Sequence, residues 1–113
     1  DEALAYTIAN IEGVHAALPG KPIAILEAGC ATTAAEFGER ASEVSQARHY
    51  RELHDWAAEA NITVFFFEAF DEPWKGGGES AGPNEVEKHW GVYYENRTPK
   101  ESFSNYLKVM SIK

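Results

Sequence analysis

PIAILE, residues 22–27, and TVFFFEAF, residues 63–70, are the two stretches that decide the fold of this chain. The first is a short, continuous apolar run, the pattern of a strand covered on both faces. The second is rich in aromatic and β-branched residues, which favour strands. Residues 42–60 between them carry a helical pattern, and strands that a helix separates pair in parallel. The sequence therefore predicts an α/β fold with two parallel strands in a single domain, residues 1–113.

Helices are predicted before and between these strands. Over residues 1–18, apolar side chains recur at three- and four-residue spacing, and Pro19-Gly20 ends the pattern. The helix over residues 42–60 begins at Ser42, a favourable N-cap residue. Its apolar residues are expected to form the buried side of the helix. They are Val44, Ala47, Leu53, Trp56 and Ala57.

A long irregular stretch, residues 71–98, follows the second strand and precedes a last helix predicted over residues 100–110. Loops of this length inside a compact domain are usually functional or disordered, and we interpret this one as functional. Its run Gly76-Gly77-Gly78 is followed by neither a Lys-Ser/Thr pair nor a helix start. We therefore interpret the glycine run as a flexible loop and not as a phosphate-binding one.

Two strands are too few for a comfortable parallel sheet, because they leave two open edges and little core. The α-β-α-β-α alternation is typical of a segment of a (β/α)8 TIM barrel, which takes about 250 residues and eight strands. We therefore expect a partial barrel that is completed by oligomerisation or by further chain. The start at Asp1, without Met or a signal-like segment, suggests a processed, excised or engineered fragment of something longer.

The composition excludes several functional classes. The 113 residues include 18 acidic and 10 basic side chains, a formal charge of -8 that argues against a nucleic-acid partner. Three Trp, five Tyr and six Phe are too much apolar bulk for a disordered chain. No run approaches the ~20 apolar residues of a membrane-spanning helix. Cys30 is the single cysteine and the four His lack metal-ligand spacing, so neither a disulfide nor a metal or cofactor is predicted.

A carboxylate ends each predicted strand. Period-2 alternation places Glu27 on the face of Ile25, and Glu68 on the face of Val64. Adjacent parallel strands stand about 4.8 Å apart, so Glu27 is expected within a few ångströms of Glu68. Retaining glycoside hydrolases use two carboxyl groups about 5 to 5.5 Å apart. Two structural alternatives stay open: Glu27 as a cap of the following loop, and Glu68 as the partner of a neighbouring Arg.

Aromatic side chains accompany these carboxylates in the long loop. Trp74 and Trp90 both lie there, the second beside Tyr93 and Tyr94. An exposed indole near carboxylates offers a flat surface for the apolar face of a sugar ring, and its N–H can donate to a hydroxyl. The alternative is that the indoles pin the loop to the body of the protein.

Three segments of the sequence carry a resemblance to a known family. Residues 22–29 (PIAILEAG) and 67–75 (FEAFDEPWK) are similar to family-17 glycoside hydrolases, and residues 85–92 (EVEKHWGV) resemble the segment after the family's eighth strand. These enzymes are β-1,3-glucanases and glucanosyltransferases, and the likeness is closest to their bacterial and fungal branches. The resemblance implies that the chain corresponds to the last quarter of a (β/α)8 barrel.

The resemblance also implies roles for particular residues. Glu27 takes the position of the catalytic nucleophile at the end of strand seven. Glu72 and Lys75 match an acidic and basic pair that lines the glucan site, while Glu68 and Trp74 match glucan-lining positions. Asp71 and Trp90 complete the predicted substrate-binding set.

Two departures from the family pattern affect these roles. Cys30 stands where a sugar-contacting Trp is common, which affects subsite shape or substrate affinity. The family's general acid/base is a Glu on strand four, and strand four has no counterpart in this chain. Loss of general acid catalysis typically lowers a rate by 10²–10⁴-fold.

The sequence therefore predicts a retaining glycoside hydrolase-like fragment that acts on β-glucan, with Glu27 as nucleophile. The acid would come from another chain, or from Glu68 or Glu72 in a new role. The expected partners are a β-glucan or oligosaccharide and a second copy or complementary barrel fragment. The alternatives are a non-catalytic, carbohydrate-binding or self-associating barrel fragment, and a relic with no function of its own.

Overall fold

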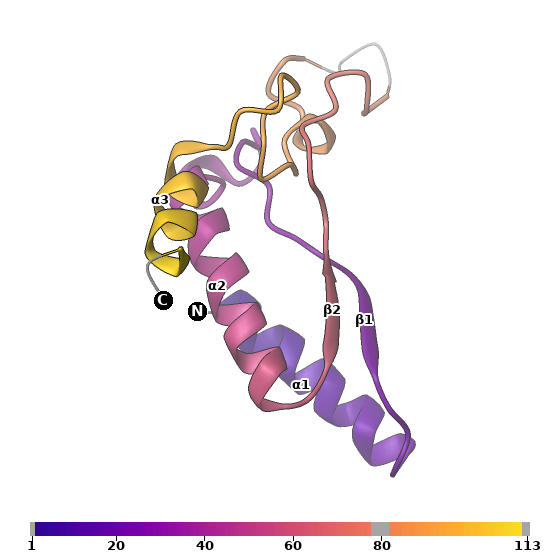
Figure 1. Cartoon of the computed structure of the whole chain (residues 1–113). Coiled ribbons are helices and arrows are strands. Elements are labelled where there is room, and N and C mark those ends of the chain that lie inside the picture. The colour runs from indigo at the N-terminus through magenta and orange to yellow at the C-terminus, as the bar shows by residue number, and fades with distance from the viewer. Residues whose placement is uncertain (1, 78–81, 112–113) are drawn as a thin grey trace.

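The computed structural model describes residues 2–77 and 82–111, so Asp1 and Gly78, on which parts of the helix and glycine-loop predictions fall, lie outside the described residues. Two strands run side by side, helices pack beside them, and the long loops gather at one end (Figure 1). In chain order the elements are α1 (Glu2–Ala17), β1 (Ala24–Ala28), the 3-10 helix η1 (Gly38–Arg40), α2 (Glu43–Glu59), β2 (Thr63–Phe66), the 3-10 helix η2 (Val86–Lys88) and α3 (Glu101–Met110).

The predicted parallel pairing of the two strands is confirmed. Ala24 pairs with Thr63, and Ala28 pairs with Phe66. Between these pairs the register shifts: β1 advances three residues after Ile25, whereas β2 advances two. Strand β1 therefore carries one extra residue, a β-bulge, before its carboxyl end. The consecutive side chains of Leu26 and Glu27 are both exposed there.

The prediction of one strand over residues 63–70 is wrong in its end, because the chain changes partner after Phe66. The Glu68 amide donates to the Trp90 carbonyl (3.3 Å), and the Asp71 amide donates to the Tyr93 carbonyl (2.9 Å). Residues 68–71 therefore pair with residues 90–93 instead of with β1. This second pairing fixes the long loop onto the carboxyl end of β2.

Close backbone approach explains two glycines at this end of the sheet. A Cβ on Gly29 would overlap the Phe67 carbonyl oxygen, and a Cβ on Gly91 would overlap the backbone of Phe70 and Asp71. Both positions bring the loops against the end of β2 at a distance that any larger residue would prevent.

Helix α2 is capped as the sequence predicts, and two of the residues expected on its buried side, Leu53 and Ala57, are buried. The Ser42 hydroxyl accepts a hydrogen bond from the Ser45 amide. The buried residues follow one another at spacings of three and four and are Gln46, His49, Leu53 and Ala57. Val44, expected to be buried, is 71% exposed because it lies about 200° around the helix from Gln46.

An aromatic cluster joins α2, β2 and α3. The Tyr50 ring lies edge-on to Phe66 at 4.8 Å and to Phe103 at 4.9 Å between ring centroids. Leu53, Ala57 and Phe103 are buried beside or near this cluster. The main packing therefore lies between α2 and its two neighbours, and helix α1 contributes no buried residue.

Much apolar surface of the sheet stays exposed. Leu26 on β1 is 77% exposed and Phe65 on β2 is 58% exposed. The radius of gyration is 15.4 Å, whereas a compact chain of this length has about 13 Å. The fold is thus an open α/β layer with two parallel strands. Within residues 2–77 and 82–111, no helix is long and apolar enough to cross a membrane.

Candidate functional site at the carboxyl ends of the strands

Two carboxylates and a lysine meet just after β2. The Lys75 ammonium donates to Glu68 Oε2 at 2.8 Å and forms an ion pair with the Glu72 carboxylate. A turn in which the Lys75 amide donates to the Glu72 carbonyl (2.9 Å) brings the last two together. The ammonium also lies 4.6 Å from the centre of the Phe67 ring. We call Glu68, Glu72 and Lys75 the outer cluster.

The outer cluster holds its two carboxyl groups in different electrostatic states. Burial raises the pKa of the Glu68 carboxyl, and the hydrogen bond from Lys75 only partly offsets this effect. The hydrogen bond from Lys75 lowers the pKa of the Glu72 carboxyl. Glu68 Oε1 is buried and has no hydrogen-bond partner among the described residues, so its acceptor capacity is unused.

The two loop tryptophans differ sharply in their surroundings. Trp74, beside the outer cluster in sequence, is 73% exposed, which leaves its ring free to stack. Trp90 is half-buried and lies edge-on to Phe67, with 6.0 Å between ring centroids. Its buried indole Nε1 has no partner within residues 2–77 and 82–111. Trp90 thus helps to pin the loop, whereas Trp74 does not.

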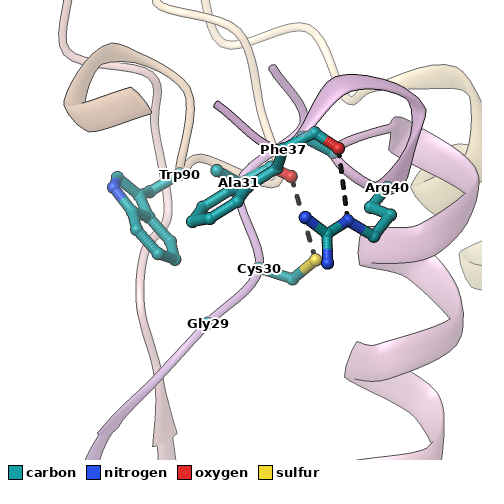
Figure 2. A pocket seen from close by; sticks show the side chains of 7 residues that line it. Gly29, Cys30, Ala31, Phe37, Arg40 and Trp90 are labelled. Carbon is teal, nitrogen blue, oxygen red and sulfur yellow. Dashed lines mark hydrogen bonds between the residues drawn. The ribbon is translucent and has the colours of Figure 1, made fainter. Parts of the chain in front are cut away.

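A hollow of about 230 Å³ lies beside Trp90 at the end of β1 (Figure 2). In this view the Phe37 ring lies between the Trp90 indole and the side chains of Cys30 and Arg40. Burial raises the pKa of the Cys30 thiol, which therefore stays protonated at neutral pH. The remaining lining residues are small: Gly29, Ala31 and Ala41.

Asp71 enters a different, buried cluster. Its Oδ1 accepts hydrogen bonds from Lys100 Nζ (2.8 Å) and the Gly91 amide (3.0 Å). Lys100 Nζ also donates to Thr32 Oγ1 at 2.6 Å. Burial lowers the pKa of Lys100, and the Asp71 carboxylate opposes that shift. We call Asp71, Lys100, Thr32 and Gly91 the inner cluster.

Glu27 stands apart from both clusters. Its side chain is exposed and makes no hydrogen bond or ion pair to any residue that the structure describes. It lines a hollow of about 340 Å³ together with Ile25 and residues of α1. The structure thus pairs Glu68 with Lys75 and not with Glu27, and it leaves the Glu27 carboxylate accessible.

Three residues that shape this end of the sheet could not be found from the sequence. Gln46 and Lys100 are each 1% exposed, although polar side chains on a helix or at its start are usually solvated. Phe37 lies in a loop where nothing in the spacing marks it. Across the described ranges, no group of three or more His, Cys, Asp or Glu side chains could hold a metal ion.

Comparisons with known proteins confirm the resemblance to family-17 glycoside hydrolases over part of the chain. A glucan 1,3-beta-glucosidase of Candida albicans is 36% identical over 77 residues, which are 67% of this chain and 24% of that protein. The glucan 1,3-beta-glucosidase of Schizosaccharomyces pombe is 39% identical over 75 residues, 66% of this chain and 22% of that protein. This chain thus spans about a quarter of the length of these curated relatives. No family model matches it.

Solved structures show the same likeness. The glycoside hydrolase family 17 β-1,3-glucanosyltransferase of Rhizomucor miehei superposes with a TM-score of 0.73 at 28% identity, over 88% of this chain and 35% of that chain. An endo-laminarinase of Formosa gives a TM-score of 0.77 at 26% identity, over 95% of this chain and 29% of that chain. An active-site mutant of the Rhizomucor miehei protein was solved in complex with laminaritriose.

Proposed function

We propose that the chain is part of the barrel of a retaining glycoside hydrolase or transglycosidase that acts on β-1,3-glucan. The observation that carries the proposal is the outer cluster, which places an unpartnered carboxylate oxygen of Glu68 in the same loop as the exposed Trp74. The relatives named as glucan 1,3-beta-glucosidases and the laminaritriose complex indicate the substrate class.

The outer cluster suits a sugar with many hydroxyl groups. Glu68 Oε1 would accept a hydrogen bond from a hydroxyl, and the Lys75 ammonium keeps the Glu72 carboxylate charged beside it. The Trp74 ring would stack on the apolar face of a glucose unit. Trp90 would form the wall of the neighbouring subsite, where the hollow beside Cys30 leaves room that a larger side chain would fill. Asp71 would contribute indirectly, because its carboxylate accepts the Gly91 amide and so holds the loop that carries Trp90.

Glu27 would act as the nucleophile, because its carboxylate is exposed and free of ion pairs to the described residues. One carboxylate oxygen would bond to the anomeric carbon while the glycosidic C–O bond breaks and the leaving oxygen takes a proton from an acid. Water or a sugar hydroxyl would then release the glycosyl group. The acid would come from outside this chain, or from Glu68, whose raised pKa favours the protonated form.

A second candidate function is a non-catalytic barrel segment that binds glucan or associates with itself. The exposed apolar residues Leu26 and Phe65 favour it, since contiguous exposed apolar surface usually marks an interaction site. Further parallel strands, from a second copy or from a complementary barrel segment, would cover this surface and complete the partial (β/α)8 barrel.

The test combines mass by light scattering with hydrolysis of laminarin by the wild type, Glu27→Gln and Glu59→Gln. Glu59, an exposed residue at the end of α2, is the matched control. Catalysis by Glu27 requires turnover that survives Glu59→Gln and disappears in Glu27→Gln. Laminarin binding without turnover in any of the three would support the second candidate and reject the first for this chain.

A further inference from the structure

We propose that Gln46 and Lys100 are positioning residues, which lock the loop after β1 and the loop at residues 89–92 into the relative placement that the glucan site requires. The inference rests on the proposed function only in taking the ligand of the site to be glucan. The hydrogen bonds that hold the two loops do not depend on that function. The two side chains come from α2 and from the residue preceding α3. The Gln46 amide contacts both loops directly, whereas the Lys100 ammonium contacts Thr32 of the first loop and reaches the second through Asp71.

Gln46 joins three carbonyl groups at once. Its Nε2 lies 2.9 Å from the Cys30 carbonyl oxygen, 2.9 Å from that of Trp90 and 3.0 Å from that of Gly91. The first carbonyl belongs to the loop after β1 and the other two to the loop that follows η2. A side-chain amide has two N–H groups, so all of its donor capacity is spent on bridging these loops.

Lys100 bridges the same loops through the inner cluster. Its ammonium donates to Thr32, in the loop after β1, and to Asp71, whose Oδ1 also receives the Gly91 amide. The Thr32 amide in turn donates to the His89 carbonyl at 2.9 Å. Two buried side chains from different elements therefore impose one relative position on the two loops.

Core packing alone does not require these polar groups. Burying an amide or an ammonium costs free energy that its hydrogen bonds must offset, and apolar side chains of similar volume often stabilise a core as well or better. Polar residues in this position specify geometry instead. Here the geometry concerns the proposed site directly, since the Trp90 carbonyl that Gln46 holds also accepts the Glu68 amide (3.3 Å).

A shift of residues 89–92 would therefore move Trp90 and Glu68 together relative to Cys30. Glu27 lies three residues before Cys30 on the same segment. Gly29 of that segment packs directly against the Phe67 backbone, so no space separates the nucleophile segment from the end of β2. Loosening the bridge would open the hollow beside Cys30 and disturb the spacing between the nucleophile segment and the sugar-binding segment.

The test is amide hydrogen exchange of Gln46→Met and the milder Thr32→Val, together with laminaritriose affinity. We expect exchange to rise at least tenfold in residues 28–34 and 86–93, with no change in α2 beyond its first turns or in β2. Laminaritriose affinity should fall about tenfold. Gln46→Glu should lose affinity at neutral pH and regain part of it on acidification, because a protonated carboxyl donates again to a carbonyl.

Leu53→Val is the control for a purely structural effect. Leu53 is buried on the same side of α2 as Gln46, but its apolar side chain has no hydrogen-bonding group that could hold either loop. It should lower protection evenly over α2, β2 and α3 and leave affinity unchanged. The proposal is overturned if Gln46→Met and Thr32→Val lower protection evenly as Leu53→Val does, or leave the two loops protected. If the wild type binds no laminaritriose, the proposed function fails, while the exchange pattern still decides the positioning roles.

Discussion

Asp71 and Glu72 are neighbours in the sequence, yet their carboxylates enter opposite environments. In the inner cluster, the Asp71 and Lys100 side chains are 11% and 1% exposed, and Thr32 and the Gly91 amide complete their hydrogen bonds. In the outer cluster, Lys75 and Glu72 are 30% and 26% exposed, and Glu68 keeps an unpartnered oxygen. A buried cluster whose polar groups bond to one another holds structure. A partly exposed cluster that keeps an unpartnered acceptor can also bind a ligand.

Burial decides which of the two clusters matters for folding. Buried ion pairs lose much solvation free energy, and removal of one partner leaves a buried charge that nothing compensates. Exposed ion pairs gain little, because water and salt screen them. Substitution of the lysine should therefore lower the free energy of unfolding strongly in the inner cluster and only slightly in the outer cluster.

The largest expected effect comes from Lys100→Met, which leaves the Asp71 carboxylate buried without its cation. We expect the free energy of unfolding to fall by about 3–5 kcal/mol. Denaturant unfolding monitored by circular dichroism measures it, with the exposed Lys21→Met as control. The double variant Asp71→Asn with Lys100→Met should recover part of the loss. A cost for Lys100→Met no larger than that for Lys21→Met would show that the inner cluster is not structural.

Lys75→Met should show the opposite pattern in the outer cluster. The unfolding midpoint should move little, since the Lys75 and Glu72 side chains are partly exposed and water screens the pair. Laminaritriose affinity should fall about tenfold, which corresponds to about 1.4 kcal/mol, because two neighbouring carboxylates would lose the cation between them. Isothermal titration calorimetry measures the affinity. A large loss of stability without loss of affinity would reverse the roles of the two clusters.

The contrast between the clusters also separates what the sequence could reveal from what it could not. The parallel strands and the Ser42 cap could be predicted, because period, composition and a partner three residues away are local signals. The outer cluster is local too, since Glu72 and Lys75 lie three residues apart. The inner cluster is not, because the partners of Lys100 lie 29 and 68 positions away.

Two errors have the same physical origin. The end of β2 was misplaced because residues 68–71 find their hydrogen-bond partners in residues 90–93, far along the chain. The buried side of α2 is predicted correctly at Leu53 and Ala57 but wrongly at Val44, because Gln46 and His49 occupy the first part of that side. Hydrophobic pattern alone cannot identify a stripe whose polar members are buried by tertiary hydrogen bonds.

The pH dependence of stability should distinguish the two carboxylates of the outer cluster. The raised pKa of Glu68 means that the folded state binds more protons just above the ordinary carboxyl range, so stability falls there as pH rises. The lowered pKa of Glu72 means that stability is lost as pH falls through its folded value. Unfolding curves from about pH 3 to 7 measure both slopes.

Glu68→Gln should abolish the first slope and change stability at neutral pH by less than about 1 kcal/mol, in the stabilising direction. Glu72→Gln should abolish the second slope and weaken the first, because Glu72 also raises the pKa of Glu68. Identical pH profiles for the two variants would contradict the assignment of opposite shifts to neighbouring carboxyl groups.

The smallest effect is expected at Tyr94, which borders the inner cluster. Its ring centre lies 5.7 Å from Lys100 Nζ, and its hydroxyl donates to the Glu43 carboxylate, whose other oxygen accepts the Glu101 amide at 2.8 Å. That hydrogen bond raises the pKa of Tyr94 to about 12. Tyr94→Phe keeps the ring and removes the hydroxyl, so stability should fall by only about 0.5 kcal/mol.

Absorbance titration of tyrosinate should lose its step near pH 12 in the same variant. Tyr94→Ala removes the ring as well, which should admit water to Lys100 and cost more than Tyr94→Phe. If the two variants cost the same, the ring does not shield the ammonium. The inner cluster would then owe its burial to the two loops alone, and substitution of Gln46 should expose Lys100 to solvent, whereas substitution of Tyr94 should not.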